Sequence, residues 1–206
     1  MPYAVRLVHS VNQAMSGESQ QKNPLNLPNS LTLFRLVCIP AVVLCLYFPG
    51  RAASFLAALF FGLAFVTDFL DGYFARRYGD VTNLGKFLDP LADKILVSVT
   101  MIMLITLNRI PVWVVMLIIA REMAVTGLRG IAVVEGVVIP ASALGKYKTL
   151  SQALTTLCLC LHYEYFGVNF HTVGMVLLWV ALFLTLWSGW AYFKTFYRLL
   201  FPRKGS

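Results

Sequence analysis

Charged side chains are scarce in this chain of 206 residues. Asp, Glu, Lys and Arg make up 13% of it and hydrophobic residues 59%, whereas a soluble globular domain has about 25% charged residues. So few charged groups leave most of any surface apolar. The shortage therefore excludes an ordinary soluble domain and indicates an integral membrane protein.

Cysteine is also rare, and its spacing excludes two kinds of site. The chain has four cysteines, and the two closest in sequence, Cys158 and Cys160, are two positions apart. Paired metal-binding or redox cysteines are three positions apart. No internal repeat or low-complexity tract is present either, so a repeat architecture is excluded.

The N-terminal segment lacks a long apolar run, because Arg6 and His9 interrupt it. We therefore expect no signal peptide there. Apolar residues between Ala4 and Met15 nevertheless recur at helical spacing. Residues 1–25 are thus expected to be an N-terminal arm, either an interfacial amphipathic helix or a disordered segment.

Six long apolar segments follow this arm. A helix needs about 20 predominantly apolar residues to cross a bilayer. The segments run over residues 31–48, 52–78, 90–107, 111–135, 144–163 and 172–200. We predict an all-α integral membrane protein in which residues 26–206 form one domain of six transmembrane helices.

The basic residues predict the orientation of these helices. Of seventeen Lys and Arg residues, only Arg51 and Arg109 lie in the connections after the first, third and fifth segments. Because Lys and Arg are in excess on the cytoplasmic side, both termini should be cytoplasmic. The net charge of +8 is explained by attraction to anionic membrane lipids, so we expect no nucleic acid partner.

Five of the nine acidic residues lie in one stretch, DFLDGYFARRYGDVTNLGKFLDPLAD, which starts at residue 68. Asp68 and Asp71 fall on one face of the second predicted helix, and Asp89 and Asp93 on one face of the third. Both pairs lie at the cytoplasmic ends of antiparallel neighbours, so we expect one polar pocket that faces the cytoplasm. Asp80 lies in the connection and is expected to be solvated.

Small residues accompany the four carboxylates. Gly72 and Ala75 share the face of the first pair, and Gly85 that of the second, which leaves room for a bulky ligand. Carboxylates this close repel one another unless a cation lies between them. Four hard oxygen ligands suit two divalent cations, Mg²⁺ or Mn²⁺.

Two structural alternatives remain open for this stretch. The acids could be neutralised by its basic residues, Arg76, Arg77, Lys86 and Lys94. Alternatively, Asp89 could be an N-cap with Pro90 opening the third helix. Neither alternative requires the small residues on the acidic faces, so the metal site is favoured.

The stretch resembles the signature of the CDP-alcohol phosphotransferase family. The matching residues are Asp68-x-x-Asp71-Gly72-x-x-Ala75-Arg76, then eight residues, then Gly85-x-x-x-Asp89-x-x-x-Asp93. The resemblance implies the fold of this family, six transmembrane helices in a homodimer, and transfer from a CDP-linked donor with release of CMP.

The same resemblance implies roles for individual residues. Asp68, Asp71 and Asp89 would hold the two divalent cations, and Asp93 would be the general base and also contact metal. The remaining signature residues would bind the donor; they are Gly72, Ala75, Arg76 and Gly85.

A second set of polar residues concerns the acceptor. Arg129, Lys146 and Lys148 lie near the cytoplasmic ends of the fourth and fifth segments and could bind the phosphate of an anionic acceptor. Alternatively, they are flanking charges that include a Glu122–Arg129 ion pair.

Three further stretches resemble the branch of the family that uses CDP-diacylglycerol and sn-glycerol 3-phosphate. They are Asn26-Leu27-Pro28-Asn29-x-Leu31-Thr32-x-x-Arg35, Arg121-Glu122 with Thr126-Gly127-Leu128-Arg129, and Gly145-Lys146-x-Lys148-Thr149. The likeness favours Arg129, Lys146 and Lys148 as ligands of the acceptor phosphate. Asn29 and Thr32 would contact the donor nucleotide, unless they are helix N-caps.

The sequence thus predicts a phospholipid-synthesising transferase in a bacterial cytoplasmic membrane, in contact with membrane lipids. One alternative is a related transferase that uses inositol phosphate, serine or another alcohol. A more distant one is a divalent-cation transporter, which would place its acids near the bilayer midplane. The acids here lie at one edge, which argues against transport.

Overall fold

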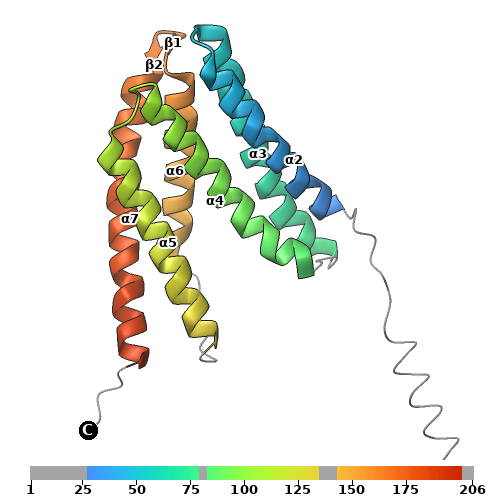
Figure 1. The fold of residues 1–206 in the computed structure, drawn as a ribbon, viewed down its shortest axis with the longest axis vertical. Helices are drawn as coiled ribbons and strands as arrows, with labels where there is room; N and C mark the ends of the chain where they lie inside the picture. Colours follow the sequence, from blue (N-terminus) through green and yellow to red (C-terminus); the bar gives the residue numbers. More distant parts are fainter. Residues whose placement is uncertain (1–26, 79–82, 135–142, 201–206) are drawn as a thin grey trace, which may run out of the picture.

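The structure, a computed structural model, describes residues 27–78, 83–134 and 143–200 (Figure 1). These residues form six helices and one short hairpin. The elements are α2 (Leu27–Tyr47), α3 (Arg51–Tyr78), α4 (Asn83–Thr106), α5 (Val112–Val134), α6 (Ala143–Leu161), β1 (Glu164–Tyr165), β2 (Val168–Asn169) and α7 (Phe170–Leu200). The predicted N-terminal arm, residues 1–25, lies outside the described residues.

Each helix overlaps one of the six predicted apolar segments, so the prediction of an all-α fold is confirmed. The clearest difference is the start of α4, which begins at Asn83 rather than at Pro90. Asp89 is therefore inside the helix, and the alternative that made it an N-cap is wrong. A proline removes one backbone hydrogen bond, and α4 continues through it, as α2 does through Pro40.

The start of α2 bears on two predicted donor contacts. The helix begins at Leu27, so Asn29 lies in its first turn and Thr32 in its second. An N-cap flanks the first helical residue, so neither residue is at that position. Their side chains lie outside the described set, and donor contact stays a prediction.

The helices form two arms that meet at one end and diverge at the other (Figure 1). The first arm consists of α2, α3 and α4, in which α2 packs against both others. The second consists of α5, α6 and α7, in which α7 packs against both others. The β1–β2 hairpin lies at the closed end, and the two arms contact each other through α3 and α6 and through α4 with both α5 and α6.

Arg109, in the connection between α4 and α5, holds the closed end together. Its side chain is buried, and its Nη1 donates to the carbonyl oxygens of Leu159 at 3.3 Å and Cys160 at 3.0 Å. Its Nη2 donates to the Ser54 hydroxyl at 2.8 Å. The arginine thus satisfies carbonyls at the end of α6, which have no partner within the helix, and ties α6 to α3.

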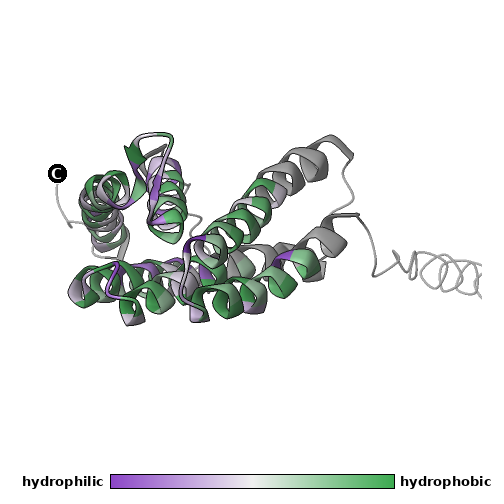
Figure 2. Cartoon of the chain, turned by 90° about the horizontal axis from the view of Figure 1, so that it is seen from above, coloured by the Kyte–Doolittle hydropathy of each residue, from purple (hydrophilic) through white to green (hydrophobic). Residues whose placement is uncertain are grey.

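The distribution of side chains is unlike that of a soluble protein. Large apolar residues such as Met116, Phe183 and Trp190 are exposed, and apolar residues occur on outer as well as inner helix faces (Figure 2). Buried side chains include Thr155, Thr185 and other polar residues. Monomeric soluble proteins rarely expose large contiguous apolar patches, so this surface suits an apolar surrounding.

By length and composition alone, fewer of the described helices qualify as membrane spans than the six predicted. Among the described residues, one helical stretch, Phe170–Tyr197 in α7, is long and apolar enough to cross a membrane on its own. Three shorter apolar stretches of 10–17 residues occur at Leu33–Tyr47, Arg51–Thr67 and Lys94–Thr106.

Candidate active site

The four signature aspartates lie on two consecutive helices. Asp68 and Asp71 are in the C-terminal part of α3, and Asp89 and Asp93 are in the N-terminal part of α4. Their side chains lie outside the described set, as do those of the predicted donor-binding residues, Asn29, Thr32, Gly72, Ala75, Arg76 and Gly85. No group of three or more His, Cys, Asp or Glu occurs among the residues that are described. The metal site therefore stays a prediction.

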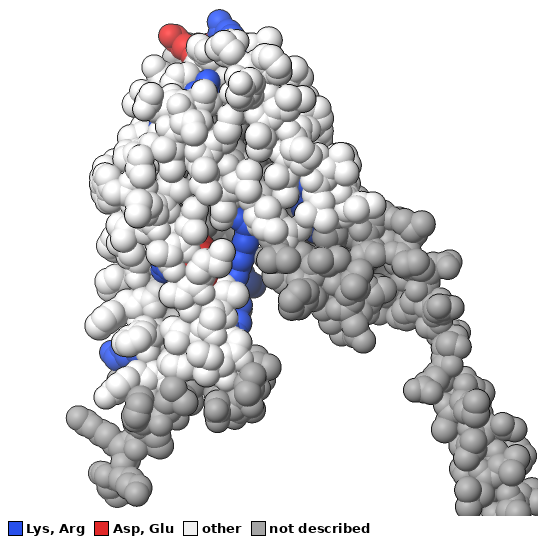
Figure 3. Space-filling view, in the orientation of Figure 1, with Lys and Arg blue, Asp and Glu red and all other residues white. Residues whose placement is uncertain are grey.

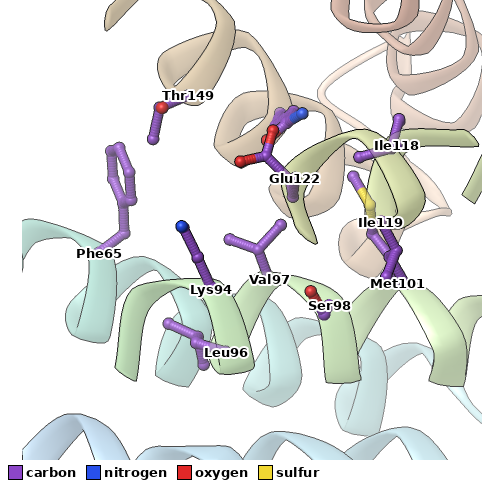
Figure 4. Close-up of a pocket in the computed structure, with 11 residues that line it drawn as sticks. Phe65, Lys94, Leu96, Val97, Ser98, Met101, Ile118, Ile119, Glu122 and Thr149 are labelled. Carbon is purple, nitrogen blue, oxygen red and sulfur yellow. The ribbon is translucent and has the colours of Figure 1, made fainter. Parts of the chain in front are cut away.

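A cavity of about 190 Å³ adjoins the aspartate-bearing turns. Phe65 lies three residues before Asp68, and Lys94 directly follows Asp93. The lining comes from α3, α4, α5 and α6 and consists of Phe65, Lys94, Leu96, Val97, Ser98, Met101, Ile118, Ile119, Glu122, Thr149 and Gln152 (Figure 4). The Lys94 ammonium group and the Glu122 carboxylate point toward the same space (Figure 4), so the cavity has an apolar wall and a charged side.

Glu122 is the centre of the charged side. Its carboxylate accepts a hydrogen bond from Arg121 Nη1 at 3.1 Å and another from the Lys148 ammonium group. All three side chains are largely buried, with 10%, 16% and 8% exposure for Arg121, Glu122 and Lys148. A buried carboxylate is costly unless it is paired, and here two cations share one acid.

Lys94 joins α4 to this cluster. Its ammonium group donates to the Thr126 hydroxyl, which in turn donates to the Glu122 carbonyl oxygen at 2.7 Å. Three cations therefore surround one carboxylate among the described residues of the cluster, and the excess charge suits an anionic ligand. Basic atoms, with acidic atoms beside them, gather in the hollow between the two arms (Figure 3).

The three predicted phosphate ligands have different surroundings. Lys148 is buried against Glu122, whereas Lys146 is exposed. Arg129 is also exposed and lies seven residues after Glu122, about 10 Å along the helix. Its Nη2 donates to the Tyr192 hydroxyl at 2.7 Å. Among the described residues, the ion pairs of Glu122 are those with Arg121 and Lys148, so the alternative Glu122–Arg129 ion pair is wrong.

Helix α7 supplies partners that sequence reasoning missed. Thr185 accepts a hydrogen bond from Gln152 Nε2 at 2.9 Å, and Ser188 accepts one from Arg121 Nη2 at 2.8 Å. Together with Tyr192 they are spaced at i, i+3 and i+7, on one face of the helix. This spacing within an otherwise apolar segment was the signal that could have identified them.

Comparison with known proteins places the chain in a family. The family model described as CDP-alcohol phosphatidyltransferase matches residues 25–187. That range contains all four aspartates and the three predicted phosphate ligands.

Curated relatives are similar over most of the chain. A CDP-diacylglycerol–glycerol-3-phosphate 3-phosphatidyltransferase of Bacillus subtilis is 43% identical, covering 82% of this chain and 94% of its own. One of Rickettsia felis is 42% identical with the same coverage. A probable phosphatidylglycerophosphate synthase of Mycobacterium tuberculosis is 41% identical, covering 80% and 78%. From the family match and these likenesses together, the chain belongs to the CDP-alcohol phosphatidyltransferase family.

Proposed function

We propose that this protein transfers the phosphatidyl group of CDP-diacylglycerol to sn-glycerol 3-phosphate, with release of CMP. The observation that carries the proposal is the 41–43% identity to relatives named for this reaction, over about four-fifths of the chain. The excess of cations around Glu122 supports an anionic acceptor. Family membership leaves the cation transporter without support.

The aspartates are suited to a pair of divalent cations. Asp68, Asp71, Asp89 and Asp93 provide hard oxygen donors on two consecutive helices, which is the ligand chemistry that Mg²⁺ and Mn²⁺ prefer. Bound there, the cations would offset charge on the donor diphosphate as CMP leaves. Signature residues Gly72, Ala75, Arg76 and Gly85, with Asn29 and Thr32 of α2, would contact that donor.

Asp93 is proposed to move the proton. A carboxylate within hydrogen-bond reach of the acceptor hydroxyl can take its proton during attack. The new bond joins the acceptor oxygen to the phosphorus that carries diacylglycerol, and the bond from that phosphorus to the CMP oxygen breaks. CMP leaves with the electron pair.

The acceptor phosphate is proposed to bind Arg129, Lys146 and Lys148. Arg129 and Lys146 are exposed, so they can meet a soluble ligand. Lys148 gives one hydrogen bond to Glu122 and has three N–H donors in all. All three lie on α5 and α6, whereas the aspartates lie on α3 and α4. The phosphate would thus be held away from the metals and would not compete with the diphosphate for them.

We expect the protein to be a homodimer in a bacterial cytoplasmic membrane, with all six helices of each protomer crossing the bilayer. The family is associated with membranes, and the exposed apolar side chains suit contact with membrane lipids. The divergent end of the arms, with the charged groups, would face the cytoplasm. Acyl chains could then enter from the bilayer and glycerol 3-phosphate from the cytosol.

The reaction is tested by CMP release. Purified protein with CDP-diacylglycerol and Mg²⁺ or Mn²⁺ should release CMP when sn-glycerol 3-phosphate is added, and little when inositol, inositol phosphate or serine replaces it. Protein carrying Asp89→Asn is the control for contaminating activity. CMP release with another acceptor, and none with glycerol 3-phosphate, would contradict the proposed acceptor.

The aspartate roles predict different defects. Asp68→Asn, Asp71→Asn and Asp89→Asn should abolish activity and weaken Mn²⁺ binding, because each removes a charged ligand. Asp93→Asn should lower kcat by about 10²-fold or more, as loss of a general base does, while donor binding is largely kept. Asp80→Asn is the matched control and should leave activity unchanged. Near-normal turnover of the Asp93→Asn enzyme at neutral pH would rule out its role as base.

The orientation predicts which loops react with a membrane-impermeant thiol reagent. In a protein without its native cysteines, Thr82→Cys should react only from the cytoplasmic side, because it lies between α3 and α4. Val168→Cys, in the β1–β2 hairpin, should react only from the opposite side. Reaction of both cysteines from the same side would show that the six-helix topology is wrong.

A further inference from the structure

Helix α7 carries a polar face directed at α5 and α6. Thr185, Ser188 and Tyr192 are buried, with 0%, 0% and 8% exposure, on a helix that is otherwise strongly apolar. Ser188 and Tyr192 bind Arg121 and Arg129 respectively. Both lie beyond residue 187, where the family match ends, so that match assigns them no role.

We propose that Tyr192 is a positioning residue for the acceptor, which holds the Arg129 guanidinium in the orientation that receives the phosphate. The inference rests on the proposed function, in which Arg129 is a phosphate ligand. Tyr192 itself does not touch the reacting atoms. It acts through Arg129.

Two contacts fix the guanidinium at once. The Tyr192 hydroxyl accepts from Nη2 at 2.7 Å, and the guanidinium carbon of Arg129 lies 5.3 Å from the centre of the Tyr192 ring. The hydrogen bond sets the direction of the planar guanidinium group, and the cation–π contact holds that group over the face of the ring. Tyrosine is a stiff anchor, because it has few rotatable bonds and is here largely buried.

Such an anchor matters because Arg129 is exposed. A free arginine side chain loses much rotamer freedom when it is ordered, and that loss weakens binding of the ligand that orders it. Tyr192 orders the side chain before the phosphate arrives. It accepts one of the five N–H donors of the guanidinium, so a pair remains for a phosphate, which arginine binds in a bidentate manner.

The neighbouring turn of α7 holds the Arg121 side chain in a similar way. Ser188 donates its own hydrogen to the Leu184 carbonyl oxygen at 2.6 Å, which leaves its lone pairs to accept from Arg121. At Gly189, an added Cβ would come within 3.0 Å of Arg121 Cγ and Nε, so the glycine provides space for this side chain. Two arginines of α5 are thus held by successive turns of one helix.

The alternative is that Tyr192 merely ties α7 to α5. A structural tie would affect thermal stability and both substrates alike. A positioning role would affect the acceptor alone, and only while Arg129 is present. The two roles can therefore be separated by kinetics.

The test uses Tyr192→Phe in the full-length protein, which removes the hydroxyl and keeps the ring. We expect the KM for glycerol 3-phosphate to rise about threefold to tenfold, the effect of losing one ordinary hydrogen bond. The KM for CDP-diacylglycerol, kcat and Tm should stay close to those of the unchanged protein. The matched control is Tyr165→Phe. The guanidinium carbon of Arg51 lies 4.5 Å from the centre of the Tyr165 ring, but this pair is at the closed end.

The decisive comparison is made in an Arg129→Ala background. There Tyr192→Phe should cause no additional rise in the acceptor KM, since the group that it positions is gone. An unchanged acceptor KM in the single variant would overturn the proposal, as would an equal rise in both backgrounds or a rise in both substrates' KM. If the unchanged protein releases no CMP with glycerol 3-phosphate, the proposed function itself fails, which is a distinct result.

Discussion

The pairing of one buried carboxylate organises the open end of this protein. Glu122 lies among apolar helices, where an unpaired charge is strongly unfavourable, and it is bound by Arg121 of its own helix and by Lys148 of α6. Removing any one member would leave the others imperfectly compensated. Because Arg121 also reaches Ser188, the same group of charges joins α5 and α6 to α7.

The two ends of the bundle are therefore built differently. At the closed end, Arg109 uses its donors on the carbonyl groups of α6 and on Ser54, so its hydrogen bonds serve the fold. At the divergent end, the cations among the described residues outnumber the carboxylate that they surround, and Arg129 and Lys146 remain exposed. The hydrogen bonds at the closed end can fix the relative position of the two arms, while substrates enter at the divergent end.

Much of this arrangement could be predicted from the sequence. Apolar segments of bilayer length located all six helices, and the four-residue and three-residue spacing placed the aspartates on common helix faces. The start of α4 differs from the prediction because a proline often opens a helix, whereas Pro90 lies inside this one. The Glu122–Arg129 pair was mispredicted because partners between helices depend on packing, which spacing along one helix does not report. On α7 the spacing of the polar residues indicates a common face, but it does not indicate that their partners lie on α5 and α6.

We propose that the acceptor phosphate binds on α5 and α6, at a site separate from that of the metals on α3 and α4. The most direct test is equilibrium binding of radiolabelled glycerol 3-phosphate to the purified protein in EDTA. Binding should persist without divalent cations and should weaken roughly tenfold or more in Arg129→Ala, as expected for loss of a charged hydrogen bond. Binding that disappears in EDTA, returns with Mg²⁺ or Mn²⁺, and is unaffected by Arg129→Ala would contradict it.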